Sequence, residues 1–372
     1  MSNRKPLYQA VHDVLYEEIS KGQYKLGDQI PTEKELSERF HVSRITITTA
    51  LSLLVDEGLI NRQAGRGSFI TNTPQTIEVD DSDSDKSKYI GLVMSGMSDS
   101  YGNTLFSSIC EECDKRGYSV VIKITRENQE LEGKYLQELS DSRVKGVLIL
   151  PVQEEFYDAR LISMILDKYP IVTIDRKLEK IPTSFVGVDN TAAARTAVEF
   201  LFANGHKNIS VITQSNIHNS SIASRLSGIR EGHAVNGITL NENIWINDLV
   251  SDYTCVPGSE SVERDIAIIM RTLERYPQIT CLLSLSNHCA ELVMEAVCRM
   301  KKKIPDDYSL LSFDTPTTVF SKANITHIAQ HEALIGKRAV NILLEKIRHP
   351  EGDIIESIID TTLVDNGTVR KI

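Results

Sequence analysis

Polar side chains follow several apolar segments of the chain, at the point where each segment ends. The residues with groups able to bind small molecules are Tyr101, Asp175, Arg225, Asn287, Asp314 and Gln330, together with Ser95, Ser286 and His288. Carboxylates and guanidinium groups each engage two adjacent hydroxyls, carboxamides donate and accept hydrogen bonds, and an aromatic ring covers an apolar face. The set therefore suits a neutral, polyhydroxylated ligand. For any one of these residues, a strand-end cap or a plain surface position is the competing explanation.

The elements that must position these residues are short apolar runs alternating with helical patterns from Tyr89 onward. The runs are 90–94, 120–124, 147–150, 171–174, 209–213, 281–285 and 310–313, and the helices include 104–116, 191–204, 222–234, 288–302 and 331–347. Fully apolar strands joined by crossover helices predict parallel sheets covered on both faces. The segment is long enough for two α/β lobes. Ligands of such sheets bind beyond the carboxyl ends of the strands, so we expect these polar residues to converge there.

A second group of candidate residues lies in the stretch 30–70, where basic and hydroxyl side chains accompany two short helical patterns. Thr32 and Glu35 form a T-x-x-E capping box, which predicts a helix from Glu33 that ends near His41. Ser43 can cap a second helix, for which Gly58 marks the end. Leu36 and Phe40 form the apolar side of the first helix, and Ile47, Leu51, Leu54 and Val55 form that of the second.

The segments 59–63 and 68–71 around Gly65, Arg66 and Gly67 predict a glycine hairpin, and a periodic segment at 7–21 predicts a supporting helix. Helix, turn, helix and basic hairpin together describe a winged helix-turn-helix, whose second helix suits the major groove of DNA. The candidate DNA-binding residues are Lys34, Ser43, Arg44, Thr46, Thr48, Arg62, Gly65, Arg66 and Gly67. A solvated charged face is the alternative explanation for any single one of them.

The motifs PTEKELSERFHVSRITI and LLVDEGLINRQAGRGSFI resemble the GntR-type winged helix, with its P-[ST]-E-x-x-L, V-S-R-x-T, E-G-L and G-x-G-[ST]-[FY] pattern. The match covers about residues 7–71. The resemblance implies that Lys34, Arg44 and Gly65 contact operator DNA. The chain departs from the pattern at Thr48, where many members carry a second arginine in the recognition helix. This departure suggests a different operator half-site.

From about residue 89 to residue 364 the chain resembles the effector domain of LacI/GalR-type regulators. The segments carrying the resemblance include KYIGLVMSGMSDSY, PIVTIDR, VGVDNTAAARTAVEFLFANGHKNI, LLSLSN and THIAQHEALIGKRAVNILL. It implies a two-lobed fold of the periplasmic-binding-protein type I, with sugar contacts at the six residues named first. Ser286-Asn287 replaces the usual N-D pair, and Phe313-Asp314-Thr315 replaces Y-D-D. A GntR-type domain stands in place of the family's own DNA-binding domain, and this combination implies a neutral monosaccharide such as L-arabinose.

Charge is divided unevenly along the chain. Residues 1–72 carry nine basic and nine acidic side chains, so residues 73–372 carry the whole net charge of −10. Attraction to DNA phosphates must therefore come from local clustering in the recognition helix and hairpin. This favours a homodimer on a two-fold operator, because each DNA-binding domain alone should bind weakly.

Composition restricts the class of protein further. No apolar run approaches the roughly 20 residues needed to span a bilayer, and the N-terminal segment lacks the apolar centre of a signal peptide. We therefore expect a cytoplasmic protein that does not contact membranes. The six cysteines are scattered, and Cys110 and Cys113 form C-x-x-C within a helical pattern, so we expect reduced, structural cysteines. No metal site and no cofactor are expected.

The sequence thus predicts a multidomain protein: a winged helix-turn-helix at 1–72, a flexible acidic linker at 73–88 and a two-lobed α/β effector domain at 89–372. Its expected function is transcriptional regulation, as a repressor of sugar-utilisation genes, without catalytic residues. The alternative is a winged helix fused to an aminotransferase-like enzyme that holds pyridoxal phosphate. Such domains are usually longer, and the chain has no G-x-S-x-G, phosphate-loop or H-E-x-x-H motif. A sugar-binding transport component fits neither the N-terminus nor the DNA-binding domain.

Overall fold

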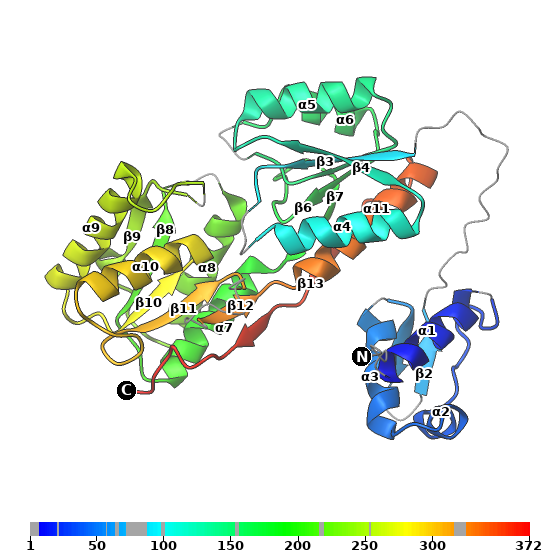
Figure 1. Ribbon diagram of the computed structural model, residues 1–372, viewed down its shortest axis with the longest axis horizontal. Helices are drawn as coiled ribbons and strands as arrows, with labels where there is room; N and C mark the ends of the chain where they lie inside the picture. Colours follow the sequence, from blue (N-terminus) through cyan, green and yellow to red (C-terminus); the bar gives the residue numbers. More distant parts are fainter. Residues whose placement is uncertain are drawn as a thin grey trace, which may run out of the picture. The chain divides into compact units, whose positions relative to one another are not determined.

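The computed structural model divides the chain into two compact units, residues 1–86 and 87–372. It describes the 372-residue chain except for residues 1–6, 21, 57, 64–66, 72–87, 98–100, 153–155, 216–218, 253 and 316–324. The predicted linker at 73–88 therefore lies almost wholly outside the described residues. Figure 1 shows the two units, each of which is described by itself.

The N-terminal unit contains three helices and a two-stranded antiparallel sheet within its described residues. These elements are α1 (Leu7–Ser20), α2 (Glu33–Phe40), α3 (Arg44–Asp56), β1 (Ile60–Gln63) and β2 (Gly67–Ile70). The predicted capping box is confirmed, because Thr32 accepts from the Glu35 backbone while Glu35 accepts from the Thr32 backbone. Helix α2 ends at His41, which adopts a left-handed conformation. This early end creates the tight turn into α3.

The core of this unit is formed by one face of each helix and by the hairpin. Val11, Leu15 and Ile19 of α1 pack with Leu36 of α2 and with a buried row on α3. In the hairpin, Gly67 has φ +112°, and an added Cβ would lie 2.3 Å from Nε2 of Gln29. The positive φ favours glycine at this position, whereas the end of the flexible Gln29 side chain could move aside. The winged helix-turn-helix architecture is confirmed.

The second unit consists of two lobes, each built on a six-stranded sheet within the described residues. The first sheet has the order β13-β7-β6-β5-β3-β4 and the second β14-β12-β11-β10-β8-β9. The first comprises β3 (Tyr89–Met94), β4 (Ser119–Ile124), β5 (Val147–Ile149), β6 (Ile171–Ile174), β7 (Ser184–Val188) and β13 (Glu356–Ile359); the second comprises β8 (Ile209–Gln214), β9 (Ile246–Leu249), β10 (Cys281–Ser284), β11 (Ser309–Phe313), β12 (Thr326–Ala329) and β14 (Thr362–Val364). All neighbouring strands run parallel except β12 and β14.

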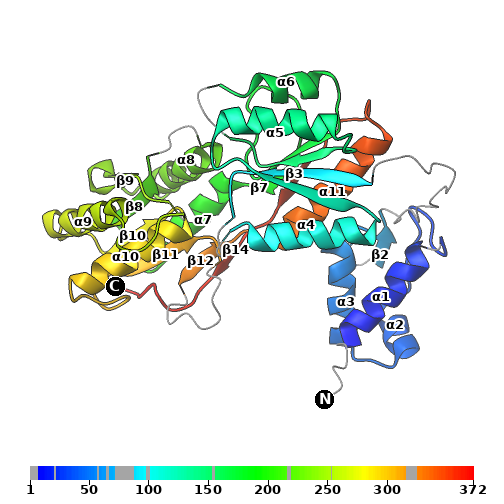
Figure 2. The same ribbon diagram turned by 45° about the horizontal axis from the view of Figure 1, so that its top comes forward.

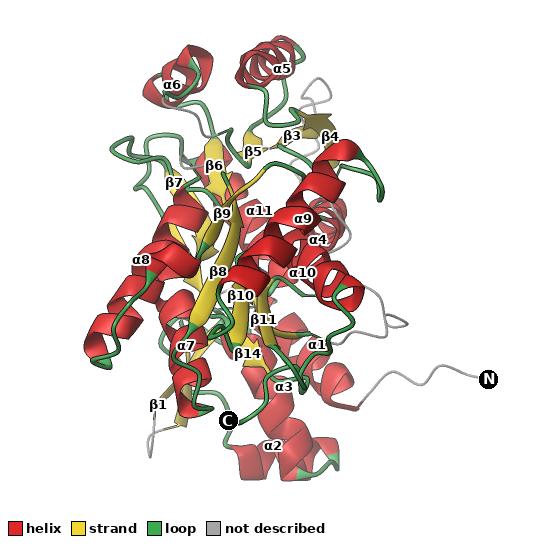
Figure 3. Ribbon diagram, turned by 90° about the vertical axis from the view of Figure 1, so that its left-hand side faces the viewer, coloured by secondary structure: helices red, strands yellow, loops and turns green. Residues whose placement is uncertain are grey.

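Helices cover both faces of each sheet, as fully apolar parallel strands require (Figures 2 and 3). In the first lobe α4 (Asn103–Lys115) and α11 (Glu332–Arg348) pack on one face, and α5 (Gln129–Asp141) and α6 (Ala159–Leu166) on the other. In the second lobe, α7 (Asn190–Ala203) and α8 (Ser220–Val235) lie opposite α9 (Glu260–Arg275) and α10 (Asn287–Arg299), and a 3-10 turn spans Glu242–Ile244. Along β10, Leu282 faces α9 and α10 while Leu283 faces α7.

The chain passes between the lobes three times. It crosses from β7 to α7 at Asp189, from β12 to α11 at Gln330 and His331, and from β13 to β14 at 360–361. Gln330 is one of the six predicted ligand residues, so one crossover carries a predicted site residue directly. Because α11 and β13 belong to the first lobe, both lobes are built from segments far apart in the sequence.

Candidate functional site

The six predicted ligand residues lie together in the second unit, around the carboxylate of Asp314. Gln330 Nε2 donates to Asp314 Oδ1 at 2.5 Å, and the backbone N–H of Asn287 donates to the same carboxylate. Burial raises the pKa of Asp314, while the positive charge of Arg225 and the bond from Gln330 lower it. Asn287, Asp314 and Gln330, which span 43 positions of the sequence, thus meet at the ends of β10, β11 and β12.

Both aspartates of the cluster occupy strand ends with unusual backbone conformations. Asp175 follows β6 with φ 63° and Asp314 follows β11 with φ 71°, so each lies in the left-handed region. Aspartate tolerates this region better than most residues, and such conformations concentrate at functional sites. The turn after each strand redirects the chain at the residue that carries the carboxylate. Ser221 Oγ also donates to the backbone oxygen of Asp175 at 3.3 Å, which ties α8 to this turn.

Arg225 links three segments of the second lobe. Its Nε donates to Asn190 Oδ1 and its Nη1 to the backbone oxygen of Leu285, both at 2.7 Å, and its guanidinium lies 4.2 Å from the centre of the Phe313 ring. Arg225 lies in the second turn of α8, which begins at Ser220. Asn219 caps the helix, since its side chain accepts from the first turn.

The phenol of Tyr101 lies among the acidic groups of the site. Burial raises its pKa well above the ordinary value, and the charges of Asp175, Glu332 and Asp314 raise it further. The hydroxyl therefore keeps its proton at any physiological pH. Tyr101 precedes Gly102, the residue that begins the first turn of α4.

Two carboxamide oxygens of the cluster are buried without a hydrogen bond from any described residue. These atoms are Oδ1 of Asn287 and Oε1 of Gln330. Both side chains are almost wholly buried, at 5% and 3% exposed. A buried acceptor that lacks a donor costs about 1–3 kcal/mol. Together with the Tyr101 phenol, these oxygens give the site the capacity to bind a ligand rich in hydroxyl groups.

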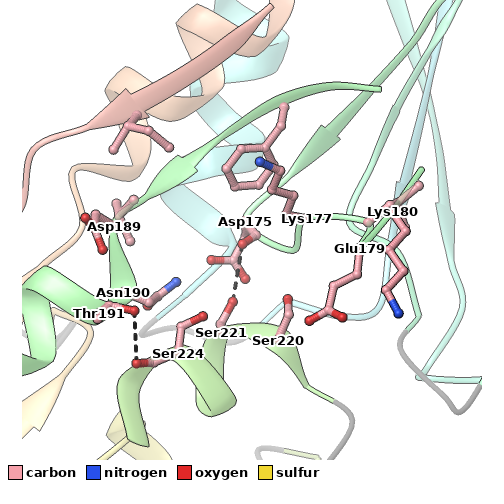
Figure 4. Close-up of a pocket in the computed structure, with 14 residues that line it drawn as sticks. Asp175, Lys177, Glu179, Lys180, Asp189, Asn190, Thr191, Ser220, Ser221 and Ser224 are labelled. Atoms are coloured by element: carbon pink, nitrogen blue, oxygen red, sulfur yellow. Dashed lines mark hydrogen bonds between the residues drawn. The ribbon is translucent and has the colours of Figure 1, made fainter. Parts of the chain in front are cut away.

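A cavity of about 420 Å³ adjoins the cluster at Asp175 (Figure 4). Its walls come from the β6–β7 connection, the start of α7 and the first turns of α8: Asp175, Lys177, Leu178, Glu179, Lys180, Phe185, Val188, Asp189, Asn190, Thr191, Ser220, Ser221, Ser224 and Ile358. Asn190 belongs to this wall and also holds Arg225, so it connects the cavity with the cluster. Sequence reasoning named Asp175 but missed the rest of this wall.

Glu332 is a further residue of the site that sequence reasoning missed. Its Oε2 accepts from the backbone N–H groups of Gly102 at 2.9 Å and Leu105 at 3.3 Å, which satisfies donors in the first turn of α4. Burial, with the charges of Asp314 and Asp175, raises the pKa of Glu332 to about 7. The residue follows a crossover between the lobes and thereby connects that crossover to the Tyr101 segment. The only sequence signal for Glu332 is its position two residues after Gln330.

The N-terminal unit presents the other group of predicted residues. Lys34, Ser43 and Arg44 are exposed, whereas Thr46 and Thr48 are half-buried. Ser43 Oγ accepts from the Thr46 backbone at 3.2 Å and bonds to its hydroxyl at 2.8 Å, so the predicted cap is present. Arg44 begins α3 with its side chain exposed, in the position that a DNA contact requires.

On the hairpin, two of the predicted DNA-binding residues, Arg62 and Gly67, have roles within the domain itself. Arg62 is exposed but forms an ion pair with Glu33 of α2, so its charge is partly neutralised. The glycine at 67 is explained by its positive φ. Gly65 and Arg66 lie outside the described residues. DNA binding by the hairpin therefore stays a prediction.

Comparison with family models assigns both units. Residues 7–70 match the model for bacterial regulatory proteins of the gntR family. Residues 198–369 match the model for a periplasmic binding protein-like domain. The first match spans the three helices and the hairpin, and the second spans the second lobe together with α11, β13 and β14.

Some relatives are similar to this chain along nearly their whole length. The protein named "Probable HTH-type transcriptional regulator EndR" of Paenibacillus polymyxa is 27% identical over 87% of this chain and 93% of its own. The arabinose metabolism transcriptional repressor of Geobacillus stearothermophilus is 23% identical over 95% and 94%. Among solved structures, transcription regulator CcpA of Lactococcus lactis has a TM-score of 0.65 over 77% of this chain and 100% of its own, with 18% identity, which shows the fold.

The fold, the buried polar cluster and the exposed head of α3 define a two-domain transcriptional regulator. The chain combines a helix-turn-helix domain that matches the gntR-family model with a domain that matches the periplasmic binding protein-like model. The alternative of an aminotransferase-like domain has no support, because the matched families and folds are those of transcription regulators. Within the described residues, no helix has the length and apolar character that crossing a membrane requires.

Proposed function

We propose that this regulator represses sugar-utilisation genes and that a neutral sugar bound at the Asp314 cluster changes its affinity for operator DNA. The observation that carries the proposal is the pair of buried carboxamide oxygens on Asn287 and Gln330, for which no described residue supplies a donor. Sugar hydroxyls are the donors that these oxygens lack. Asp314, Asp175 and Tyr101 add further hydrogen-bonding groups around the same point.

Arabinose heads the list of sugars to test, because a relative similar along nearly its whole length is named for arabinose metabolism. The proposed contacts are Tyr101, Asp175, Arg225, Asn287, Asp314 and Gln330. The charges of Asp175, Asp314 and Glu332 against that of Arg225 disfavour an anionic ligand such as a sugar phosphate. A neutral pentose or hexose meets no such repulsion.

A thermal-shift screen of the full chain against pentoses, hexoses and their phosphates tests the ligand class. A sugar at 100 times its dissociation constant should add about 2.7 kcal/mol to the free energy of unfolding. Calorimetry then measures the affinity of each sugar that raises the melting temperature. A screen in which sugar phosphates bind and neutral sugars do not would contradict the proposal. A visible absorption band from a bound pyridoxal Schiff base would instead support the enzyme alternative.

For operator DNA we propose the exposed head of α3 and the hairpin as the binding surface, with Arg44 as its main contact. The gntR-family match and the exposure of Arg44 at the first turn of α3 support this role. We propose Lys34 and Arg66 as further contacts to DNA. We propose a homodimer because residues 1–72 carry no net charge, so a single domain has little long-range attraction to DNA.

We further propose domain limits of 1–72 and 89–372, which match the division of the structure at residue 86 to within the predicted linker. Each segment contains a complete buried core of its own. Expressed separately, each should unfold cooperatively, and 89–372 should bind the sugar as tightly as the whole chain. Sedimentation of 89–372 tests the dimer. A monomeric 89–372 at concentrations where the full chain is dimeric would contradict dimerisation through the effector domain.

A further inference from the structure

The outward face of α3 has an apolar side chain at its centre. Ile47, Ala50, Leu51 and Leu54 form the buried row of this helix, each at most 1% exposed, whereas Ile45 is 80% exposed. At about 100° per residue, Ile45 points about 180° away from the middle of that row. It is thus the side chain most directly aimed away from the protein, one residue after Arg44.

The hydroxyl groups beside Ile45 are turned toward the helix backbone. Thr49 Oγ1 donates to the backbone oxygen of Ile45, and Ser52 Oγ donates to that of Thr48, both at 2.9 Å. These bonds occupy the hydroxyl protons. The middle of this face therefore offers apolar contact, while Arg44 at its head offers charge and hydrogen bonding.

DNA has one apolar feature in the major groove, the C5-methyl group of thymine, and exposed aliphatic side chains contact it. Arg44 beside Ile45 supplies the positive charge that holds such a face against DNA. We propose that Ile45 contacts a thymine methyl group in each operator half-site and thereby selects thymine at that position. Apolar contact would take the place of the second arginine that GntR-type helices often carry at the position of Thr48. The inference rests on the proposed role of α3 in DNA binding.

The test is a double-mutant cycle between the Ile45 side chain and the thymine methyl group. Duplexes that the full chain selects from a random pool are prepared with thymine, and again with deoxyuridine in place of every thymine in the selected core. Deoxyuridine pairs in the same way but lacks the methyl group. Fluorescence anisotropy measures the affinity of wild type, Ile45→Ala and the control Leu26→Ala on both duplexes. Leu26 is also exposed, at 70%, but lies outside α3.

Wild type and Leu26→Ala should lose about fourfold in affinity on deoxyuridine for each methyl group contacted. Ile45→Ala should show a similar loss on the thymine duplex and little further loss on deoxyuridine, because the two changes remove one contact. If Ile45→Ala discriminates between the duplexes as wild type does, Ile45 contacts something other than thymine methyl groups. A chain that selects no duplex would instead overturn the proposed function together with this contact.

Discussion

Arg225 Nε and Asn190 Oδ1 lie 2.7 Å apart, and this hydrogen bond joins the second turn of α8 to the first residue of α7. Both side chains are nearly buried, at 5% and 6% exposed. Asn190 follows a crossover between the lobes and also lines the cavity beside Asp175. The arginine that we propose as a ligand contact is therefore fixed to a segment whose position depends on how the two lobes are arranged.

Replacing this arginine should abolish sugar binding. Arg225→Ala removes a buried charged donor, which should lower the affinity by about 2–5 kcal/mol, measured by calorimetry with the sugar identified in the screen. Some stability should also be lost, because the oxygens of Asn190 and Leu285 lose their donor. Arg230→Ala is the matched control on the same helix, since Arg230 is exposed and pairs with Glu242. Sugar binding by Arg225→Ala within threefold of wild type would remove Arg225 from the site.

Asn287→Leu should weaken sugar binding without lowering the stability of the protein. The substitution removes a buried oxygen that has no donor among the described residues, at the loss of one bond from Asn287 Nδ2 to Glu291. Without sugar, the variant should be as stable as wild type or more stable, while its sugar affinity falls by about 1–3 kcal/mol. Thermal melts and calorimetry measure the two quantities. The exposed Asn208→Leu should change neither, and a variant that is unstable but binds sugar normally would contradict the assigned role.

Arg44→Ala should abolish operator binding without altering sugar affinity. Arg44 is exposed at the start of α3 and is not part of the core, so the domain should fold normally. A lost bidentate contact to a base costs about 1–3 kcal/mol in each half-site. Gel-shift titration on a selected operator measures the change, with Arg39→Ala on α2 as the control. Unchanged operator affinity would exclude Arg44 from the interface.

The buried carboxyl of Glu132 should make the stability of the first lobe depend on pH. Its Oε2 accepts from the Val152 backbone at 2.6 Å, and burial raises its pKa from 4.5 to about 7. The folded state therefore holds a proton that the unfolded state releases at lower pH. The stability that the neutral Glu132 carboxyl contributes is therefore lost as the pH rises from about 4.5 to about 7.

Glu132→Gln removes this titration, because the amide stays neutral while its oxygen can still accept from Val152. At pH 8 the variant should be more stable than wild type by up to about 3 kcal/mol, and at pH 4 the two should be alike. Urea unfolding at both pH values measures the difference. Glu130→Gln on the same helix changes an exposed carboxyl and should have no comparable effect. Equal stabilities of wild type and Glu132→Gln at pH 8 would show that the carboxyl is hydrated.

Asp175 and Asp314 could be placed from the sequence because continuous apolar runs precede them, and parallel strands bring their carboxyl ends together. The strand Ser184–Val188 was missed although its side chains are all buried, since serine and glycine weaken its apolar pattern. Strand β9 was missed for the opposite reason, because two exposed polar residues interrupt it. Boundaries of the predicted helices were correct to within two residues, except that the helix predicted at 288–302 ends at Arg299.

The partners of the site residues could not be predicted in the same way. The bond between Arg225 and Asn190 depends on how α7 and α8 pack, which periodicity does not report. The cavity wall at Lys177 and Ser221 arises where a loop of one lobe meets a helix of the other. Isoleucine usually lies in a core, and only the orientation of α3 about its own axis places Ile45 on the outside.

The response of operator affinity to sugar tests the central claim most directly. Fluorescence anisotropy of a selected operator, titrated with the full chain in the presence and absence of the sugar found by the screen, measures it. We predict that saturating sugar changes the operator affinity at least tenfold, which corresponds to a coupling free energy of about 1.4 kcal/mol. Asn287→Leu should need a higher sugar concentration for the same change, in proportion to its lost sugar affinity. Equal operator affinity of the wild-type chain with and without the bound sugar would contradict the account.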